Sequence, residues 1–216
     1  MTVGLQLIEE LFEEHRLVDS AAGALCRLAE VAAAGAAGRE DVADFVQFLH
    51  VFLSGYHHQR EEGFLFPALV ERAEVPAERG PLRAIATDHR TVATLVDELE
   101  AAADSPVEVS TVARQLARHL WEHIDKENSV LLPESERRLL RHGVNRLPGR
   151  PPSAEEEAAR ALGEGLCQRF PPMEDSEMVR GDGCVACSAF TETCHGIEME
   201  WWNRWDREHH RSLDEG

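Results

Sequence analysis

Apolar side chains recur at intervals of three and four residues in four long stretches of the chain. The stretches run from about residue 5 to 33, from about 41 to 64, from 82 to 99 and from 112 to 130. This spacing places the apolar side chains on one face of an α-helix, whereas the alternation typical of strands is nearly absent. Residues 1–145 are therefore predicted to form an all-α, up-down-up-down four-helix bundle. Pro67 and Pro133 are expected to kink or end the second and fourth helices.

The sequence changes character after residue 141. Residues 146–153 are rich in proline and are predicted to form a linker. Residues 154–216 form a predicted C-terminal extension, with a short helix at 154–162, an irregular stretch that carries four of the five cysteines, and a polar helix at 198–213 with three tryptophans. We interpret this extension either as a separate module or as a cap on the bundle.

Composition narrows the range of partners. The 216 residues include 22 Lys and Arg against 40 Asp and Glu, which gives a formal net charge of −18. Such an acidic chain repels phosphate backbones and anionic lipid surfaces, so neither nucleic acid nor membrane is an expected partner. No apolar run approaches the roughly 20 residues of a membrane span, and the acidic, amphipathic start is unlike a signal peptide. We therefore expect a cytoplasmic protein whose reduced cysteines serve as metal ligands or redox groups.

An internal repeat is the strongest signal in the sequence. Residues 57–67 align without gaps on residues 123–133, and both segments contain a histidine, a basic residue, a glutamate four positions after the histidine, a leucine and a proline. Residues 14–16 and 88–90 form a second pair, because each reads acid-His-Arg. The chain therefore contains two similar helical hairpins, each with an acid-His helix followed by a His-x3-Glu helix.

The repeat points to a metal site inside the bundle. Residues four apart lie one turn apart on the same helix face, so each His-x3-Glu pair can address one point near the bundle axis. A lone inward histidine is usually an ordinary core residue, but four imidazoles and two carboxylates buried without a metal would be costly. These donors suit two divalent first-row ions bridged by the carboxylates, iron or manganese rather than zinc alone. The predicted ligands are His15, His57, Glu61, His89, His123 and Glu127.

Several other polar residues lie near these positions. His119 is a candidate extra ligand, a hydrogen-bonding partner of a ligand, or a proton relay. His58 and Glu62 form a competing His-x3-Glu pair about 100° round the helix from the apolar stripe, and the repeat places an isoleucine and an asparagine at their positions. We interpret them as residues at the edge of the core that support the ligands. His50 stays unassigned.

The cysteines of the extension predict a second metal site. Cys184 and Cys187 have the spacing of a chelating pair, and Cys167 and Cys194 can complete four thiolates. Three histidines are alternative donors: His195, His209 and His210. Zinc in a tetrahedral site is the leading interpretation, and an iron or iron–sulfur centre, a redox dithiol and plain reduced thiols are the alternatives. Cys26, on the first helix, is expected to be an inert core thiol.

These motifs resemble the hemerythrin family, specifically the bacterial hemerythrin-like proteins with HHE cation-binding domains. The resemblance covers about residues 4–141 and rests on the two acid-His pairs and the two His-x3-Glu segments, each followed by Leu-x-Pro. It implies a four-helix bundle around a non-haem di-iron centre held by the six predicted ligands. Oxygen-carrying hemerythrins add a histidine four residues after the one on the third helix, where this chain has Ala93. This difference makes a function as a simple reversible oxygen carrier less expected, unless His119 supplies the missing imidazole.

The resemblance implies a function as well as a fold. It implies a carboxylate-bridged di-iron centre that binds or senses O2 or a related small oxidant such as peroxide or nitric oxide. One alternative is a di-iron oxidase, oxygenase or peroxide- or NO-scavenging enzyme, and another is an iron- or redox-responsive regulator whose thiols report the state of the metal. No cofactor fingerprint names an organic substrate, and no motif identifies a protein partner or an electron donor.

Overall fold

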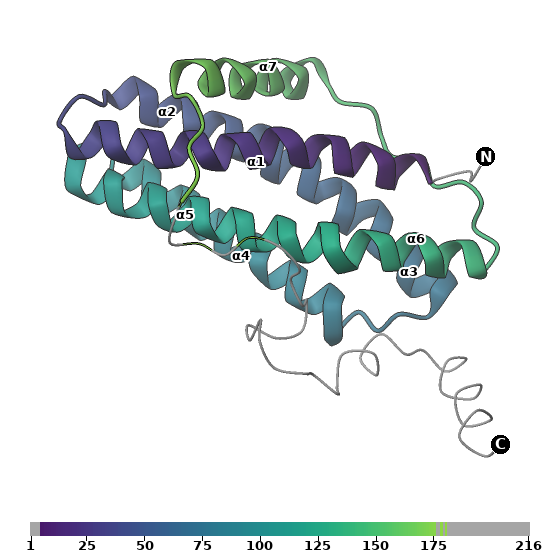
Figure 1. Ribbon diagram of the computed structural model, residues 1–216. Helices are drawn as coiled ribbons and strands as arrows, with labels where there is room; N and C mark the ends of the chain where they lie inside the picture. The colour runs from purple at the N-terminus through teal and green to yellow at the C-terminus, as the bar shows by residue number, and fades with distance from the viewer. Residues whose placement is uncertain (1–4, 176–177, 179, 181–216) are drawn as a thin grey trace.

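The computed structural model describes residues 5–175, 178 and 180. The regular structure of these residues is helical, and four long helices form a bundle (Figure 1). The first is α1 (Gln6–Ala33), and the third is α4 (Gly80–Ala101). The second comprises α2 (Arg39–Phe48), the π-helical segments η1 (Leu49–His58) and η2 (Glu61–Leu65), and α3 (Phe66–Ala73). The fourth comprises α5 (Pro106–Lys126), the π-helical segment η3 (Glu127–Leu131) and α6 (Leu132–Arg141).

Local sequence sets the ends of these helices. The chain leaves α1 through Gly35, which has a φ of +70°, a conformation that glycine adopts without steric cost. Before α5, the hydroxyl of Ser105 accepts a hydrogen bond from the backbone N–H of Glu108, and Pro106 occupies the first helical position. The prediction of an all-α four-helix bundle is confirmed.

The second and fourth helices share an interruption that follows the repeat. Each contains a π-helical segment that begins at the glutamate of the His-x3-Glu motif, η2 at Glu61 and η3 at Glu127. A proline then lies in the first turn of the next α-helix, Pro67 in α3 and Pro133 in α6. Because proline lacks an N–H and its ring crowds the carbonyl four residues earlier, a wider turn ahead of it relieves the clash. The prolines thus interrupt the α-helical pattern without ending either long helix.

The hydrophobic core is divided into two clusters along the bundle. The larger cluster includes Leu25, Phe45 and Leu99 and lies towards the α1–α2 and α4–α5 turns. The smaller cluster includes Leu11 and Leu69 and lies towards the other end. Most of the buried polar and charged side chains come from the layer between them, at residues 14–15, 57–61, 89 and 123–127. The predicted ligands therefore lie in a polar layer enclosed by apolar packing on both sides.

A further helix, α7 (Ala154–Arg169), packs against α1 and α2 (Figure 1). The hydroxyl of Ser153 caps its start by accepting a hydrogen bond from the Glu156 N–H. The predicted short helix at 154–162 is corrected, because the helix continues to Arg169. Gly163 does not break it, since its missing side chain allows close approach to Phe48: a Cβ there would lie 2.4 Å from Phe48 Cε2. This part of the predicted extension shares the larger hydrophobic cluster with the bundle.

The cysteines fall partly outside the described residues. Cys167 lies on α7, where burial raises the pKa of its thiol. Cys26 is buried in the larger cluster, and burial raises the pKa of its thiol to about 11, as expected of an inert core thiol. The zinc site stays a prediction, because its other candidate donors and the predicted helix at 198–213 lie outside the described residues: Cys184, Cys187, Cys194, His195, His209 and His210.

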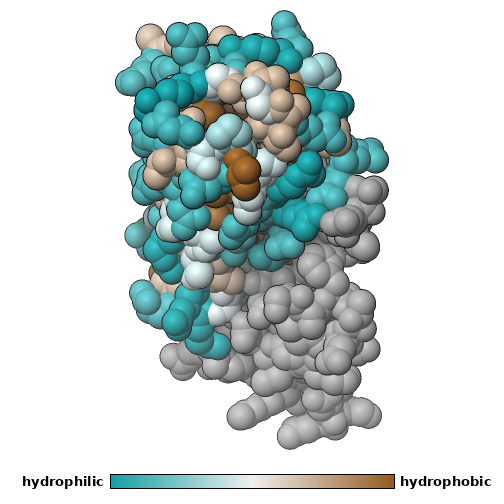
Figure 2. All heavy atoms as spheres, turned by 90° about the vertical axis from the view of Figure 1, so that its left-hand side faces the viewer, coloured by the Kyte–Doolittle hydropathy of each residue, from teal (hydrophilic) through white to brown (hydrophobic). Residues whose placement is uncertain are grey.

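The surface of the described part of the chain offers few apolar side chains. Figure 2 shows the side of the molecule at the left of Figure 1, where hydrophilic residues dominate and hydrophobic ones are scattered. Among the described residues, the large hydrophobic side chains that are exposed are Val70, Val107 and Leu140. Such scattered exposure is ordinary for a folded domain. None of the described helices has the length and apolar character that a membrane span requires.

Candidate metal centre

The six predicted ligands meet in the polar layer of the bundle, and each is at most 5 % exposed. They form two sets of four residues whose potential donor atoms lie within 4.8 Å of one another. The first, here called the His15/His57 set, and the second, the His89/His123 set, share both carboxylates, those of Glu61 and Glu127. All four long helices contribute. Two adjacent donor sets with two common carboxylates are the arrangement expected of a dinuclear site.

Each shared carboxylate lies between an imidazole of one set and an imidazole of the other. Glu127 Oε2 is 3.1 Å from His15 Nε2 and 3.1 Å from His123 Nε2. Glu61 Oε2 is 3.9 Å from His57 Nε2 and 3.2 Å from His89 Nε2. The Nε2 atoms of His15 and His57 are themselves 3.1 Å apart. All four histidines therefore present Nε2 to the shared carboxylates.

The other ring nitrogen of each histidine faces an oxygen from outside the two sets. His57 Nδ1 is 2.8 Å from Glu14 Oε2, and His123 Nδ1 is 3.8 Å from Asp88 Oδ2. The remaining two contacts pair His89 Nδ1 with Glu62 Oε1 at 2.6 Å and His15 Nδ1 with Asn128 Oδ1 at 2.6 Å. The carboxylates of Glu14 and Glu62 only accept, so they fix Nδ1 of His57 and of His89 as the donor and leave the Nε2 lone pair of each ring free. This is the way metal-binding histidines are usually oriented.

These supporting contacts follow the internal repeat. The acid that precedes the histidine of one helix supports the histidine of the next helix, as Glu14 does for His57 and Asp88 for His123. The residue after each shared glutamate supports the histidine of a neighbouring helix. The sequence predicted such a role for Glu62 but not for Glu14, Asp88 or Asn128. Glu14 and Asp88 occupy equivalent positions in the internal repeat, which was the available sign of a shared role. The role itself could be recognised only once it was known which helices are neighbours.

The basic residue of each His-x3-Glu segment holds the acid of the acid-His pair. Arg60 donates to the carboxylates of Glu14 and Glu10. Lys126 Nζ lies 2.9 Å from Asp88 Oδ2. Each half of the bundle thus contains a chain of contacts from a cation to a carboxylate to a histidine. The cation balances the charge of a carboxylate that is largely removed from water.

Whether the centre suits a pair of metal ions can be judged from its buried polar atoms that have no hydrogen-bond partner. Both carboxylate oxygens of Glu61 and of Glu127 are buried without a hydrogen bond, and so are the Nε2 atoms of His89 and His123. Leaving buried carboxylates without a compensating partner is strongly unfavourable. The unsatisfied atoms are nitrogen and oxygen donors that face one another, which is what divalent first-row cations require. The residues present therefore fit a pair of metal ions.

The electrostatics of the layer couple the imidazoles to the carboxylates. Burial would lower the pKa of His15 and His89, but the nearby carboxylate of Glu127 outweighs it, so both pKa values are raised, that of His89 strongly. Burial would raise the pKa of Glu127, yet His123 and His15 bring it well below its usual range. Burial would also raise the pKa of Asp88, but the neighbouring His123 and Lys126 lower it to about 2. Because metal ligands must lose their protons, metal binding at this centre competes with protons.

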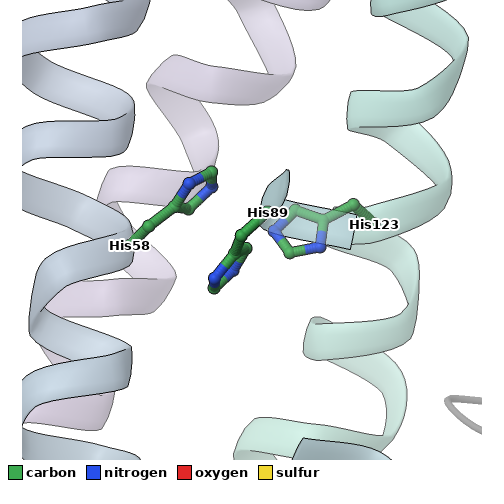
Figure 3. Close-up of side chains that lie close together, drawn as sticks. All are labelled: His58, His89 and His123. Carbon is green, nitrogen blue, oxygen red and sulfur yellow. The ribbon is translucent and has the colours of Figure 1, made fainter. Parts of the chain in front are cut away.

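Three further histidines differ in where they lie. His58, interpreted from the sequence as an edge residue, is instead buried beside His89 and His123 (Figure 3). His119 is outside all three groups of donor atoms found among the described residues, and its Nε2 lies 3.3 Å from the backbone oxygen of Asp88. His50 is partly exposed, with Nε2 3.6 Å from an oxygen of Asp97.

The comparison with family models agrees with this geometry. The model of the hemerythrin HHE cation-binding domain matches residues 6–135, more than half of the chain. The chain belongs to this family. The hemerythrin match spans all six predicted ligands, so the bundle is a metal-binding helical domain, and it ends before the linker and α7. Searches of curated proteins and of solved structures returned no match.

Proposed function

We propose that the bundle holds two iron ions and uses them to bind or sense O2 or a related small oxidant. The observation that carries this proposal is the pair of donor sets that share Glu61 and Glu127. Two imidazoles with a carboxylate are the donors of many non-haem iron sites, which keep open positions for small ligands. When bound, the iron pair would supply one-electron and O2 chemistry that side chains lack.

The surroundings favour a small ligand over an organic substrate. The six ligands lie between two apolar clusters and are nearly inaccessible to solvent. Such a site admits a molecule of two or three atoms more readily than a bulky one. Packing on both sides also excludes water and strengthens electrostatic interactions among the ligands. The chain's own residues fix the imidazoles through Nδ1 and hold the charges of the two carboxylates at the centre.

A second candidate function is an oxidase or a scavenger of peroxide or NO. Such an enzyme needs protons at its centre, and one contact favours it. The Glu62 carboxylate is 42 % exposed, yet it lies 2.6 Å from the buried His89 Nδ1, so it connects the centre to solvent. The hydrogen bond from His89 lowers the pKa of Glu62, so this carboxylate stays ionised at neutral pH and accepts the hydrogen bond from the His89 N–H. An iron- or redox-responsive regulator is the remaining alternative.

Metal analysis with O2 cycling tests the proposal. The full chain is purified beside a Cys184→Ser/Cys187→Ser variant, so that metal held by the cysteines is counted separately. We expect two irons per chain in both proteins and an absorption spectrum that changes when O2 is added to the reduced protein, which is prepared anaerobically. Full reversal on removal of O2 indicates a carrier or sensor, whereas decay with consumption of a substrate indicates an enzyme. Fewer than two metals in the bundle, or no response to O2, peroxide or NO, would contradict the proposal.

A further inference from the structure

His58 occupies a position that the predicted ligand set does not use. Its imidazole is buried and stacks on that of His89, with ring centroids 3.8 Å apart and an angle of 13° between planes. Its centroid is 5.4 Å from that of His123. Figure 3 shows the three rings gathered in one space, although they come from three different helices. His58 Nε2 is buried there without a hydrogen-bond partner.

Packing alone does not explain a histidine at this place. In the internal repeat, His58 is equivalent to Ile124, which is also buried. An apolar side chain therefore suits the same helix position in the other half of the bundle. A buried imidazole nitrogen without a partner is less stable than an apolar group of similar size. The histidine thus lowers folding stability unless something binds its nitrogen.

The donor atoms of His58 are close enough for one metal. One nitrogen from each of His58, His89 and His123 lies within 4.8 Å of the others. Metal–imidazole bonds are about 2.0–2.1 Å long, so two ligands on opposite sides of an ion are about 4 Å apart. The three nitrogens are thus near enough to share one ion, but a metal lies in the plane of each imidazole that it binds, so one of the two stacked rings, His58 or His89, has to turn for both to bind. The His15/His57 set has no comparable third imidazole among the described residues, because its equivalent is Ile124.

We propose that His58 is a fifth imidazole ligand, bound to the metal ion of the His89/His123 set. This inference rests on the proposed dinuclear centre and makes its two ions unequal. The ion of the His89/His123 set has three imidazoles, whereas the ion of the His15/His57 set has two. The second ion would therefore have fewer protein ligands and more positions left for solvent.

Cobalt titration of a variant tests the role of His58. Co(II) is added anaerobically to the metal-free protein and followed by visible absorption and calorimetry. The variant is His58→Ile, which introduces the residue type found at the equivalent position of the repeat, Ile124. The control is His50→Leu, because His50 lies away from the metal centre. We expect His58→Ile to bind two Co(II) ions, one with unchanged affinity and one about 10- to 100-fold more weakly, as is typical when support for a metal site is lost. The control should behave like the wild type.

The outcomes separate this inference from the proposed function. Wild-type binding of fewer than two Co(II) ions by the bundle contradicts the dinuclear centre itself. Two ions with equal affinities in wild type and His58→Ile overturn the role of His58 alone. If His58→Ile does not fold, proton NMR of the wild-type protein tests the same inference. In the Co(II)-loaded protein, each bound imidazole keeps one N–H with a strongly shifted proton NMR signal, and we expect five such exchangeable signals. Four signals would overturn the inference.

Discussion

Replacing Arg60 with leucine should destabilise the metal-free bundle more than any other removal of a positive charge near the centre. The Arg60 side chain is 0 % exposed and donates to Glu14, which in turn accepts from His57 Nδ1. Its guanidinium also lies 4.8 Å from the centroid of the Tyr56 ring. Removing one partner of a buried ion pair typically costs about 3–5 kcal/mol, because the other charge stays buried. We expect a loss of this size in the free energy of unfolding.

The repeat supplies a matched comparison in Lys126→Leu. Lys126 and Asp88 are 17 % and 15 % exposed, so water can reach the remaining carboxylate and the expected loss is about 1–2 kcal/mol. Both variants are unfolded with urea without metal and followed by circular dichroism. A loss below about 1 kcal/mol for Arg60→Leu, or one no larger than for Lys126→Leu, would refute this account of the buried cation.

Four further predictions concern metal, packing and pH. Glu127→Gln should leave fewer than two tightly bound metals per chain by metal analysis, because it removes a charge that both donor sets share. Chelation should lower the thermal midpoint of the wild type, since free metal at 100 times its Kd adds about 2.7 kcal/mol to stability. Gly163→Val should cost about 1–3 kcal/mol in urea unfolding through overpacking on Phe48, with two metals still bound. The hydrogen bond from Arg150 holds the pKa of Glu156 at about 2, so the stability lost in Glu156→Gln should be full above pH 4.5 and should shrink as the pH falls towards 2.

The six candidate ligands could be found from the sequence because the repeat marks them twice. His57 and Glu61, like His123 and Glu127, are four residues apart, so any helix brings each pair to one side. The supporting residues Glu14, Asp88 and Asn128 were not predicted, because their contacts depend on which helices are neighbours. Glu62 was expected to support the ligands, and the structure places it against His89.

His58 illustrates where regular helix geometry misleads. At about 100° per residue, an α-helix turns His58 away from a stripe that contains His57. The structure has π-helical segments at η1 and η2, on either side of Gln59 and Arg60. A π-helix has more residues per turn, so neighbouring residues diverge less and both histidines are buried in the polar layer. The sequence offered only the prolines as signs of irregularity.

The length of α7 was also beyond simple pattern analysis. The predicted helix ends at residue 162, immediately before Gly163 and close to Gly165, two residues with low helix propensity. The helix continues because the bundle provides the packing that the glycines lack, with Phe48 against Gly163 and the side chains of Ala159 and Leu166 in the larger cluster. Tertiary contacts therefore outweigh local helix propensity at this position.

X-ray absorption of the iron-loaded protein tests the central claim most directly. If Glu61 and Glu127 hold two ions between them, each iron has another iron as a neighbour at a distance of about 3.5–4 Å, as in other two-metal sites. We predict that iron–iron scattering appears at this distance in the wild type and in the Cys184→Ser/Cys187→Ser variant, with two irons per chain. Iron bound at full occupancy without such scattering, or scattering that disappears with the cysteines, would contradict a dinuclear centre in the bundle.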